Sequence, residues 1–405
     1  MKKIGLLAIA ILTGATAFAQ QSVLKEAERA MKDKAGIDKV VSIITPAFTN
    51  PETEKLAQTY YIPGKAAYDQ FDELFKLKAF NKLPENGVAT MGKDLIEGYD
   101  FFMKALPLDS LPDAKGKVKP KYSKDILSTI GGHYSDYNNT AIDLWGIKDF
   151  KSAYKCWDIY LNITKDASRY KGIVVPHDTL LCEIMYNQAL AAWQADELKN
   201  ALNSFMNAKA HGYTKKNLYD YAISVAAQAE DTVAVLELAR EALPMYGSED
   251  ALYIRYIIND YLIKKDFPNA LQAINQAIAN DPQNAQYYVV LGVIYDNDNK
   301  RADAKDAYKK AIELKPDDSM ALFYYGKDVC EDAYELSDKG PSDPALLDAY
   351  FNDKIRPVLL EAAEYLEKAY AADNENLDAL KYLENVYYNL KDEVNLEKTQ
   401  QRLQN

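Results

Sequence analysis

Residues 285–318 read AQYYVVLGVIYDNDNKRADAKDAYKKAIELKPDD, and this stretch decides the fold class. Its last part, AYKKAIELKPDD at 307–318, resembles AINQAIANDPQN at 273–284, one step of 34 residues earlier. Alanine and proline return at the same places in both copies. A sequence that recurs at a fixed period of this length is typical of a repeat protein, in which each unit packs only against its neighbours.

The spacing within one unit predicts two helices that pack closely. With Ala285 as place 1, one set of residues forms a stripe along a first helix at places 4, 7, 8 and 11, and another forms a stripe along a second helix at places 20, 24 and 27. Small side chains let two antiparallel helices approach, large ones fill the adjoining holes, and a proline at place 32 ends the second helix. The residues are Tyr288, Leu291, Gly292, Tyr295, Ala304, Tyr308, Ala311 and Pro316.

This pattern resembles the tetratricopeptide repeat (TPR). The same register extends to units that begin at Tyr134, Cys182, Lys216, Ala251 and Ser319, followed by a last half-unit. The resemblance therefore covers residues 134–405 and implies an all-α fold, an α-solenoid of antiparallel helix hairpins wound into a TPR superhelix. We expect an insertion near residues 331–356 and a polar capping helix at the C-terminal end.

The preceding part, residues 20–133, fits the spacing less well. We expect about two divergent TPR-like hairpins there, together with the lysine-rich loop DAKGKVKPKYSK at 113–124. In an otherwise acidic chain this loop could contact an acidic partner or a lipid headgroup, which would allow peripheral association with a cell envelope; a solvated loop is the alternative.

The first 19 residues carry the features of a cleaved signal peptide. Lys2 and Lys3 precede a short apolar run that ends in Ala17-Phe18-Ala19, an A-x-A cleavage pattern. The new first residue would be Gln20 rather than cysteine, so we expect a periplasmic or otherwise exported protein that is not a lipoprotein and has no transmembrane segment after cleavage. The formal net charge of −12 disfavours a nucleic acid partner.

Chemistry-bearing motifs are absent from the sequence. The three cysteines and three histidines are scattered, without the spacing of a zinc site or a disulfide framework. DNDNKR at 296–301 begins like a calcium loop but has Arg301 where glycine is needed, so it is better interpreted as a turn between helices. We therefore expect a non-enzymatic protein that needs no cofactor and no metal.

The TPR resemblance implies that a protein or peptide partner binds a concave surface lined by first helices, at places 2, 5, 9 and 12. In two units these places hold apolar residues, which are Ile142, Trp145, Tyr186, Leu190 and Trp193. Such clustering predicts a groove for an apolar segment of a partner. The alternative, which we favour at this point, is that the connection at 164–180 folds over this face and buries it with its GIVV segment.

Further along, Arg255 and Asn259 fall at places 5 and 9. Some TPR domains that bind chaperone tails clamp a terminal carboxylate from such places. The next units carry Val290, Met320 and Tyr324 where that clamp needs asparagine and basic residues, so its specificity is not expected here. Arg255 and Asn259 remain candidates for a polar contact with a partner.

The sequence thus predicts a protein-interaction scaffold or adaptor of a bacterial cell envelope. The alternative is a ligand-binding component for glycan or peptide uptake at the outer membrane, as in TPR-containing lipoproteins. The tryptophans and the 31 tyrosines would suit ring stacking on such a ligand, whereas the missing lipobox cysteine speaks against it.

Overall fold

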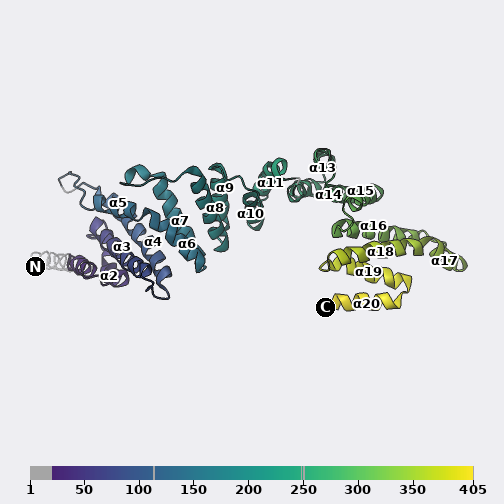
Figure 1. The fold of residues 1–405 in the computed structure, drawn as a ribbon, viewed down its shortest axis with the longest axis horizontal. Coiled ribbons are helices and arrows are strands. Elements are labelled where there is room, and N and C mark those ends of the chain that lie inside the picture. The colour runs from purple at the N-terminus through teal and green to yellow at the C-terminus, as the bar shows by residue number, and fades with distance from the viewer. Residues whose placement is uncertain (1–20, 113–114, 248, 250, 405) are drawn as a thin grey trace, which may run out of the picture. The chain divides into compact units, whose positions relative to one another are not determined.

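The computed structural model describes residues 21–112, 115–247, 249 and 251–404, and the signal peptide predicted at residues 1–19 lies outside them. In this described part of the chain every named element is a helix (Figure 1), and the one strand-like pairing is an isolated bridge between Pro112 and Val118. The predicted all-α architecture is confirmed. The chain divides into two compact units, residues 1–230 and 231–405.

The first unit is built from hairpins of neighbouring helices. After a helical segment at 21–32, its helices are α2 (Ile37–Ile44), α3 (Ala57–Ala79), α4 (Gly87–Asp109), α5 (Ser123–Gly132), α6 (Tyr134–Gly146), α7 (Phe150–Lys165), α8 (Asp178–Gln194), α9 (Leu198–Ala210) and α10 (Lys216–Gln228). Helix α3 pairs with α4, α6 with α7, and α8 with α9. The α3–α4 hairpin is longer than those that follow it, which agrees with the weak repeat spacing in this part of the sequence.

The second unit continues the same arrangement. Its helices are α11 (Thr232–Tyr246), α12 (Leu252–Ile263), α13 (Phe267–Asn280), α14 (Ala285–Asn297), α15 (Arg301–Leu314), α16 (Ser319–Asp338), α17 (Pro344–Tyr350), α18 (Arg356–Ala372), α19 (Leu377–Leu390) and α20 (Glu393–Gln404). Within this unit each helix packs against the next in the chain, except that α16 pairs with α18 across the short α17.

The predicted insertion is helical for most of its length. Helix α16 runs on to Asp338, and after a turn α17 leads through a π-helical segment, Phe351–Ile355, into α18. Helix α18 is the second helix of this hairpin, since Ala362, Leu366 and Ala369 are fully buried on it, as their spacing predicts. The boundary between residues 133 and 134, which rests on the repeat register, stays a prediction; the division by contacts falls at Glu230 instead.

A left-handed residue closes the first helix of each regular hairpin. It stands at place 15 of its unit and is never glycine: Lys148, Asp196, Glu230, Lys265, Asn299 and Lys391, with φ between 55° and 64°. In five of these turns the backbone N–H of the following residue donates a hydrogen bond to the carbonyl oxygen five residues earlier. An example is Asp149 N to Leu144 O at 2.9 Å, the hydrogen bond that ends a helix in a Schellman motif. The unit from Ser319 has no such turn, and its first helix therefore continues into the insertion.

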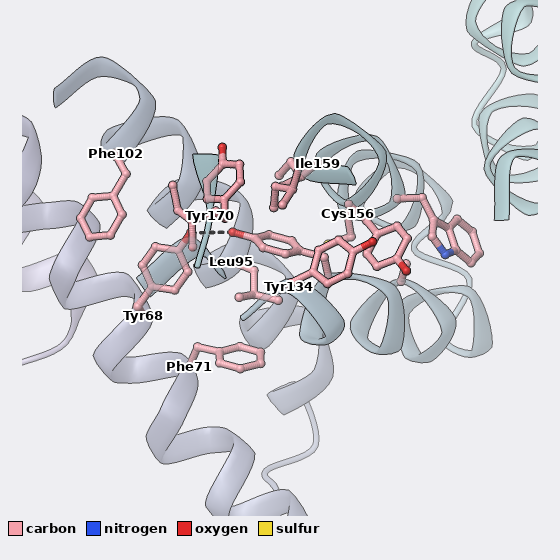
Figure 2. Packing of buried hydrophobic residues seen from close by; sticks show 14 of the residues in the cluster. Tyr68, Phe71, Leu95, Phe102, Tyr134, Cys156, Ile159 and Tyr170 are labelled. Carbon is pink, nitrogen blue, oxygen red and sulfur yellow. Dashed lines mark hydrogen bonds between the residues drawn. The ribbon is translucent and has the colours of Figure 1, made fainter. Parts of the chain in front are cut away.

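The buried residues follow the predicted stripes. Ala304, Tyr308 and Ala311 are fully buried on α15, and Gly292 faces the Tyr308 ring from α14. In the first unit the core is dense in aromatic side chains (Figure 2). Among them, the hydroxyls of Tyr68 and Tyr137 meet at 2.5 Å. These stripes hold successive hairpins together and leave the outer sides of the first helices for other contacts.

Candidate partner-binding surfaces

Three of the predicted residues line one hollow in the first unit. Ile142 and Trp145 of α6 and Leu190 of α8 surround it, together with Trp157 of α7 and Asn187 of α8. We call it the α6–α8 hollow; its volume is about 240 Å³. Ile142 keeps 54% of its surface exposed at the rim. Places 9 and 12 of successive units thus meet at one surface, as the repeat register predicts.

The aromatic side chains of the α6–α8 hollow are held rigidly. Trp157 is buried, and its Nε1 donates a hydrogen bond of 3.0 Å to Asn138 Oδ1. The ring of Trp145 packs edge-on against Phe150, with 4.9 Å between ring centroids. Fixed apolar walls with one polar side chain, Asn187, are suited to receive an apolar side chain of a partner at little cost in conformational entropy.

Tyr186 and Trp193 lie outside this hollow. Tyr186 is buried, stacks on Tyr213 at 4.4 Å and accepts a hydrogen bond of 2.8 Å from Asn217, and its burial raises the pKa of the hydroxyl. Trp193 is half-buried beside Tyr221, and its Nε1 donates to Gln228 Oε1 at 2.9 Å. Contacts within the first unit therefore occupy much of both side chains.

The connection at 164–180 does not cover the α6–α8 hollow. Its Tyr170 is buried against Gly131 at the end where α6 begins, and it joins the core that includes Leu95 and Ile159 (Figure 2). Trp145 stands near the opposite end of α6, about 16 Å along the helix axis from the first residue of α6, Tyr134, at 1.5 Å per residue. Val174 is 83% exposed. The expectation that GIVV buries this face is wrong, because the segment packs at the other end of the hairpin.

In the second unit Arg255 and Asn259 share a small groove with apolar residues. Both are exposed on α12. The groove has a volume of about 110 Å³, and its other lining residues are Ile258, Gln286, Val289, Val290, Val293, Met320 and Tyr324. The structure thus places Val290, Met320 and Tyr324 beside Arg255 and Asn259. A carboxylate clamp would need polar and basic groups at those places.

A larger polar pocket lies between α14, α15 and α16, and the sequence analysis missed it. We call it the α14–α16 pocket; its volume is about 670 Å³. It is lined by Asp296, Asn299, Arg301, Ala302, Lys305, Lys327, Asp328, Glu331, Asp332 and Glu335. The sequence offered one indication of this pocket. Asp296 stands at place 12 and Lys327 at place 9 of their units, and both places belong to the face expected to bind a partner.

Reactive groups are inaccessible or scattered. Cys156, Cys182 and Cys330 are free and buried, and burial raises the pKa of each thiol. Among residues 21–404, apart from the undescribed positions, no group of three or more His, Cys, Asp or Glu side chains is arranged to hold a metal ion. Within the same residues no helix is long and apolar enough to cross a membrane.

A family model for the tetratricopeptide repeat matches residues 285–318. The chain carries a tetratricopeptide repeat. The repeat consists of α14 and α15, the hairpin in which Tyr308 packs on Gly292. The neighbouring hairpins bury side chains at the corresponding places of their units, among them Ile254, Ala270 and Ile274. A search of curated proteins finds no match for the chain.

Solved structures of TPR proteins are similar to this chain at low identity. YrrB, described as a TPR protein with an unusual peptide-binding site, is 20% identical, with 46% of this chain and 88% of YrrB covered and a TM-score of 0.32. The C-terminal part of a TPR protein from Cytophaga hutchinsonii is 14% identical over 65% and 93%, with a TM-score of 0.37. PilF of Pseudomonas aeruginosa is 13% identical over 56% and 91%, with a TM-score of 0.40. Likeness at this level carries no information on what the present chain binds.

Proposed function

We propose that this protein is a non-enzymatic scaffold or adaptor that binds a protein or peptide partner on the concave surface lined by its first helices. TPR folds are generally protein-interaction scaffolds, and the α6–α8 hollow supplies the specific observation. Ile142, Trp145 and Leu190 come from two successive first helices and line one accessible apolar hollow. Large apolar side chains in a concave, preformed site are typical of binding hot spots.

The hollow alone does not account for tight binding. Burying one aliphatic or aromatic side chain contributes about 1.5–3 kcal/mol, and association costs several kcal/mol in lost freedom of motion. We therefore infer an extended partner that places one apolar side chain in the hollow and contacts several further first helices. A repeat protein favours such a partner, because successive units present their first helices at equivalent positions.

We also propose that the protein works in a bacterial cell envelope. The support is Lys2, Lys3, the apolar run and the A-x-A pattern that ends at Ala19, all of which lie outside the described residues. N-terminal sequencing of the native protein should find Gln20 first, in a periplasmic or membrane-associated fraction. An intact Met1 in the cytosolic fraction would overturn this part of the proposal.

Quantitative capture from an envelope extract tests the binding site. Ile142→Glu places a charge at the rim of the hollow and should reduce recovery of a defined partner by about tenfold. Lys155→Glu, on the exposed side of α7, is the matched control and should leave recovery unchanged. Equal recovery with both variants would contradict binding in the hollow. The uptake alternative predicts instead that a glycan binds the purified protein and that Trp193→Ala abolishes this binding.

A further inference from the structure

The α14–α16 pocket lies on the same kind of face as the α6–α8 hollow but has a different chemistry. Asp296 of α14 and Lys327 of α16 stand at places 12 and 9 of their units, where a partner is expected to pass. Eight of its ten lining residues carry charge, five of them acidic and three basic. The balance inside the pocket is therefore negative, like that of the whole chain.

Every basic group of the pocket already has an acidic partner. Arg301 pairs with Asp332 and with Glu335, and Lys305 also pairs with Asp332. These pairs join α15 to α16 across the pocket wall. They leave Arg301 and Lys305 less able to attract an anion, because the nearest carboxylates compensate their charge.

The third cation, Lys327, is held between two carboxylates. Its Nζ lies 3.0 Å from Asp328 Oδ1 and 3.7 Å from Asp296 Oδ2. Asp296 in turn accepts a hydrogen bond of 2.9 Å from the Tyr308 hydroxyl. The structural core of the repeat thus fixes the position of the charges at the floor of the pocket.

Two acidic groups retain unused acceptor capacity. Asp328 is fully buried and lines the pocket; its Oδ1 pairs with Lys327, and its Oδ2 has no hydrogen-bond donor among the residues that the structure describes. Glu331, one turn further along α16, is half-buried in the pocket lining and makes no hydrogen bond or ion pair within the described residues. A buried carboxylate oxygen without a donor is unfavourable, so a partner's donor that reaches it relieves this cost in addition to its own charge interaction.

We propose that the α14–α16 pocket binds a cationic side chain, the guanidinium of an arginine or the ammonium of a lysine, from the partner protein, with Asp328 and Glu331 as its acceptors. This inference rests on the proposed function, because it assumes that a partner lies along the first-helix faces. A pocket of about 670 Å³ has room for a long side chain together with water. An arginine matches two separate carboxylates better than a lysine does, because its five N–H donors are spread over a planar group.

Protonation of Asp328 should regulate this contact. Burial raises the pKa of Asp328 to about 6, partly opposed by Lys327, while Asp296 raises it further. Arg301 and Tyr308 of α15 and Tyr382 of α19 also face it. Above pH 6 the carboxylate is charged and attracts a cation; below pH 6 the protonated form no longer does.

A matched pair of peptides tests the proposal with the full chain. One is a fluorescein-labelled hexapeptide with two central arginines, and the other carries citrulline, which is uncharged and almost identical in shape, at the same two positions. At pH 7.5 we expect the fluorescence anisotropy of the arginine peptide to give a Kd about tenfold lower than that of the citrulline peptide. Glu331→Gln should remove most of this preference.

Asp317→Asn is the control, since it removes the same charge from an exposed site in the second unit outside the pocket. Equal weakening by Glu331→Gln and Asp317→Asn would show general attraction to an acidic chain and would overturn the proposal. So would equal binding of the two peptides, or loss of arginine selectivity in millimolar magnesium or calcium at constant ionic strength, which would indicate a cation site. Arginine selectivity that persists unchanged at pH 5 would contradict the role of Asp328. Failure here would leave the test of the α6–α8 hollow unaffected, because that hollow belongs to the other unit.

Discussion

Tyr308 of α15 packs its ring onto Gly292 of α14 so closely that a Cβ atom at position 292 would overlap the ring. The two residues stand at places 24 and 8 of the matched repeat, and both are buried. The sequence repeat therefore places a small residue opposite a large one in this hairpin. The hairpin closes only where one helix offers space for the other.

Gly292→Ala should therefore destabilise the second unit, although alanine is the better helix former by about 1 kcal/mol. We expect a loss of about 1–3 kcal/mol, because the new methyl group must displace the Tyr308 ring. Gly146→Ala is the matched control: a Cβ there meets nothing within 4 Å, so the same substitution should be neutral or slightly stabilising. Urea unfolding followed by circular dichroism measures both. A stable Gly292→Ala variant would mean that the helix pair is not closed in this way.

The left-handed turns predict a substitution that stabilises the protein. Asp196 has φ of 60°, a conformation that costs non-glycine residues about 1 kcal/mol. Asp196→Gly should therefore raise the free energy of unfolding of the first unit by up to about 1 kcal/mol, since the relief exceeds the greater entropy of glycine in the unfolded chain. Ala195→Gly, one residue earlier at φ of −87°, should lower it by a similar amount. Denaturant midpoints that shift in the same direction for both variants would contradict this account of the turn.

A buried carboxylate in the first unit predicts a dependence of stability on pH. Asp94 on α4 is fully buried, and both of its oxygens accept from Gln70 Nε2, at 3.1 and 3.0 Å. Burial raises its pKa to about 7, so the folded state holds the proton more tightly than the unfolded chain does. Its contribution to stability is full below about pH 4 and is lost as the pH rises to about 7.

Asp94→Asn removes the ionisable group and keeps an oxygen for Gln70. At pH 8 we expect this variant to be more stable than the parent protein by about 1–3 kcal/mol, with the difference much smaller at pH 4.5. Asp100→Asn on the exposed side of the same helix controls for the change in net charge. Thermal unfolding at pH 8 and pH 4.5 measures these differences in stability. If Asp94→Asn stabilised the protein equally at both pH values, ionisation of Asp94 would not be the cause.

The repeat register was enough to predict most of the fold and part of the candidate site. It placed Gly292 against Tyr308, and it brought Ile142, Trp145 and Leu190 to one surface, because residues at equal places of successive units must lie on equal faces. The register carries no information on segments that do not repeat. The aromatic partner of Tyr186, which is Tyr213, lies in a connection between helices, and nothing in its spacing shows where it packs.

The remaining features depend on three-dimensional detail that the sequence does not display. The segment GIVV is apolar enough to cover a surface. However, the neighbouring Tyr170 is buried beside Gly131 and holds this connection away from the α6–α8 hollow. The turns at place 15 contain no glycine, so their left-handed backbone left no signal. The α14–α16 pocket depends on three ion pairs between α15 and α16, and one of them, Arg301–Glu335, involves the part of α16 that extends beyond place 15 of its unit.

The central claim is that a partner binds at the α6–α8 hollow. A photo-crosslinking amino acid at position 142, in the full chain exposed to native envelope extract, tests this most directly. We predict one discrete adduct with a defined protein, absent when Leu190→Glu is added and absent when the crosslinker stands at position 155 on the exposed side of α7. No adduct from position 142, or the same adducts from positions 142 and 155, would contradict the claim.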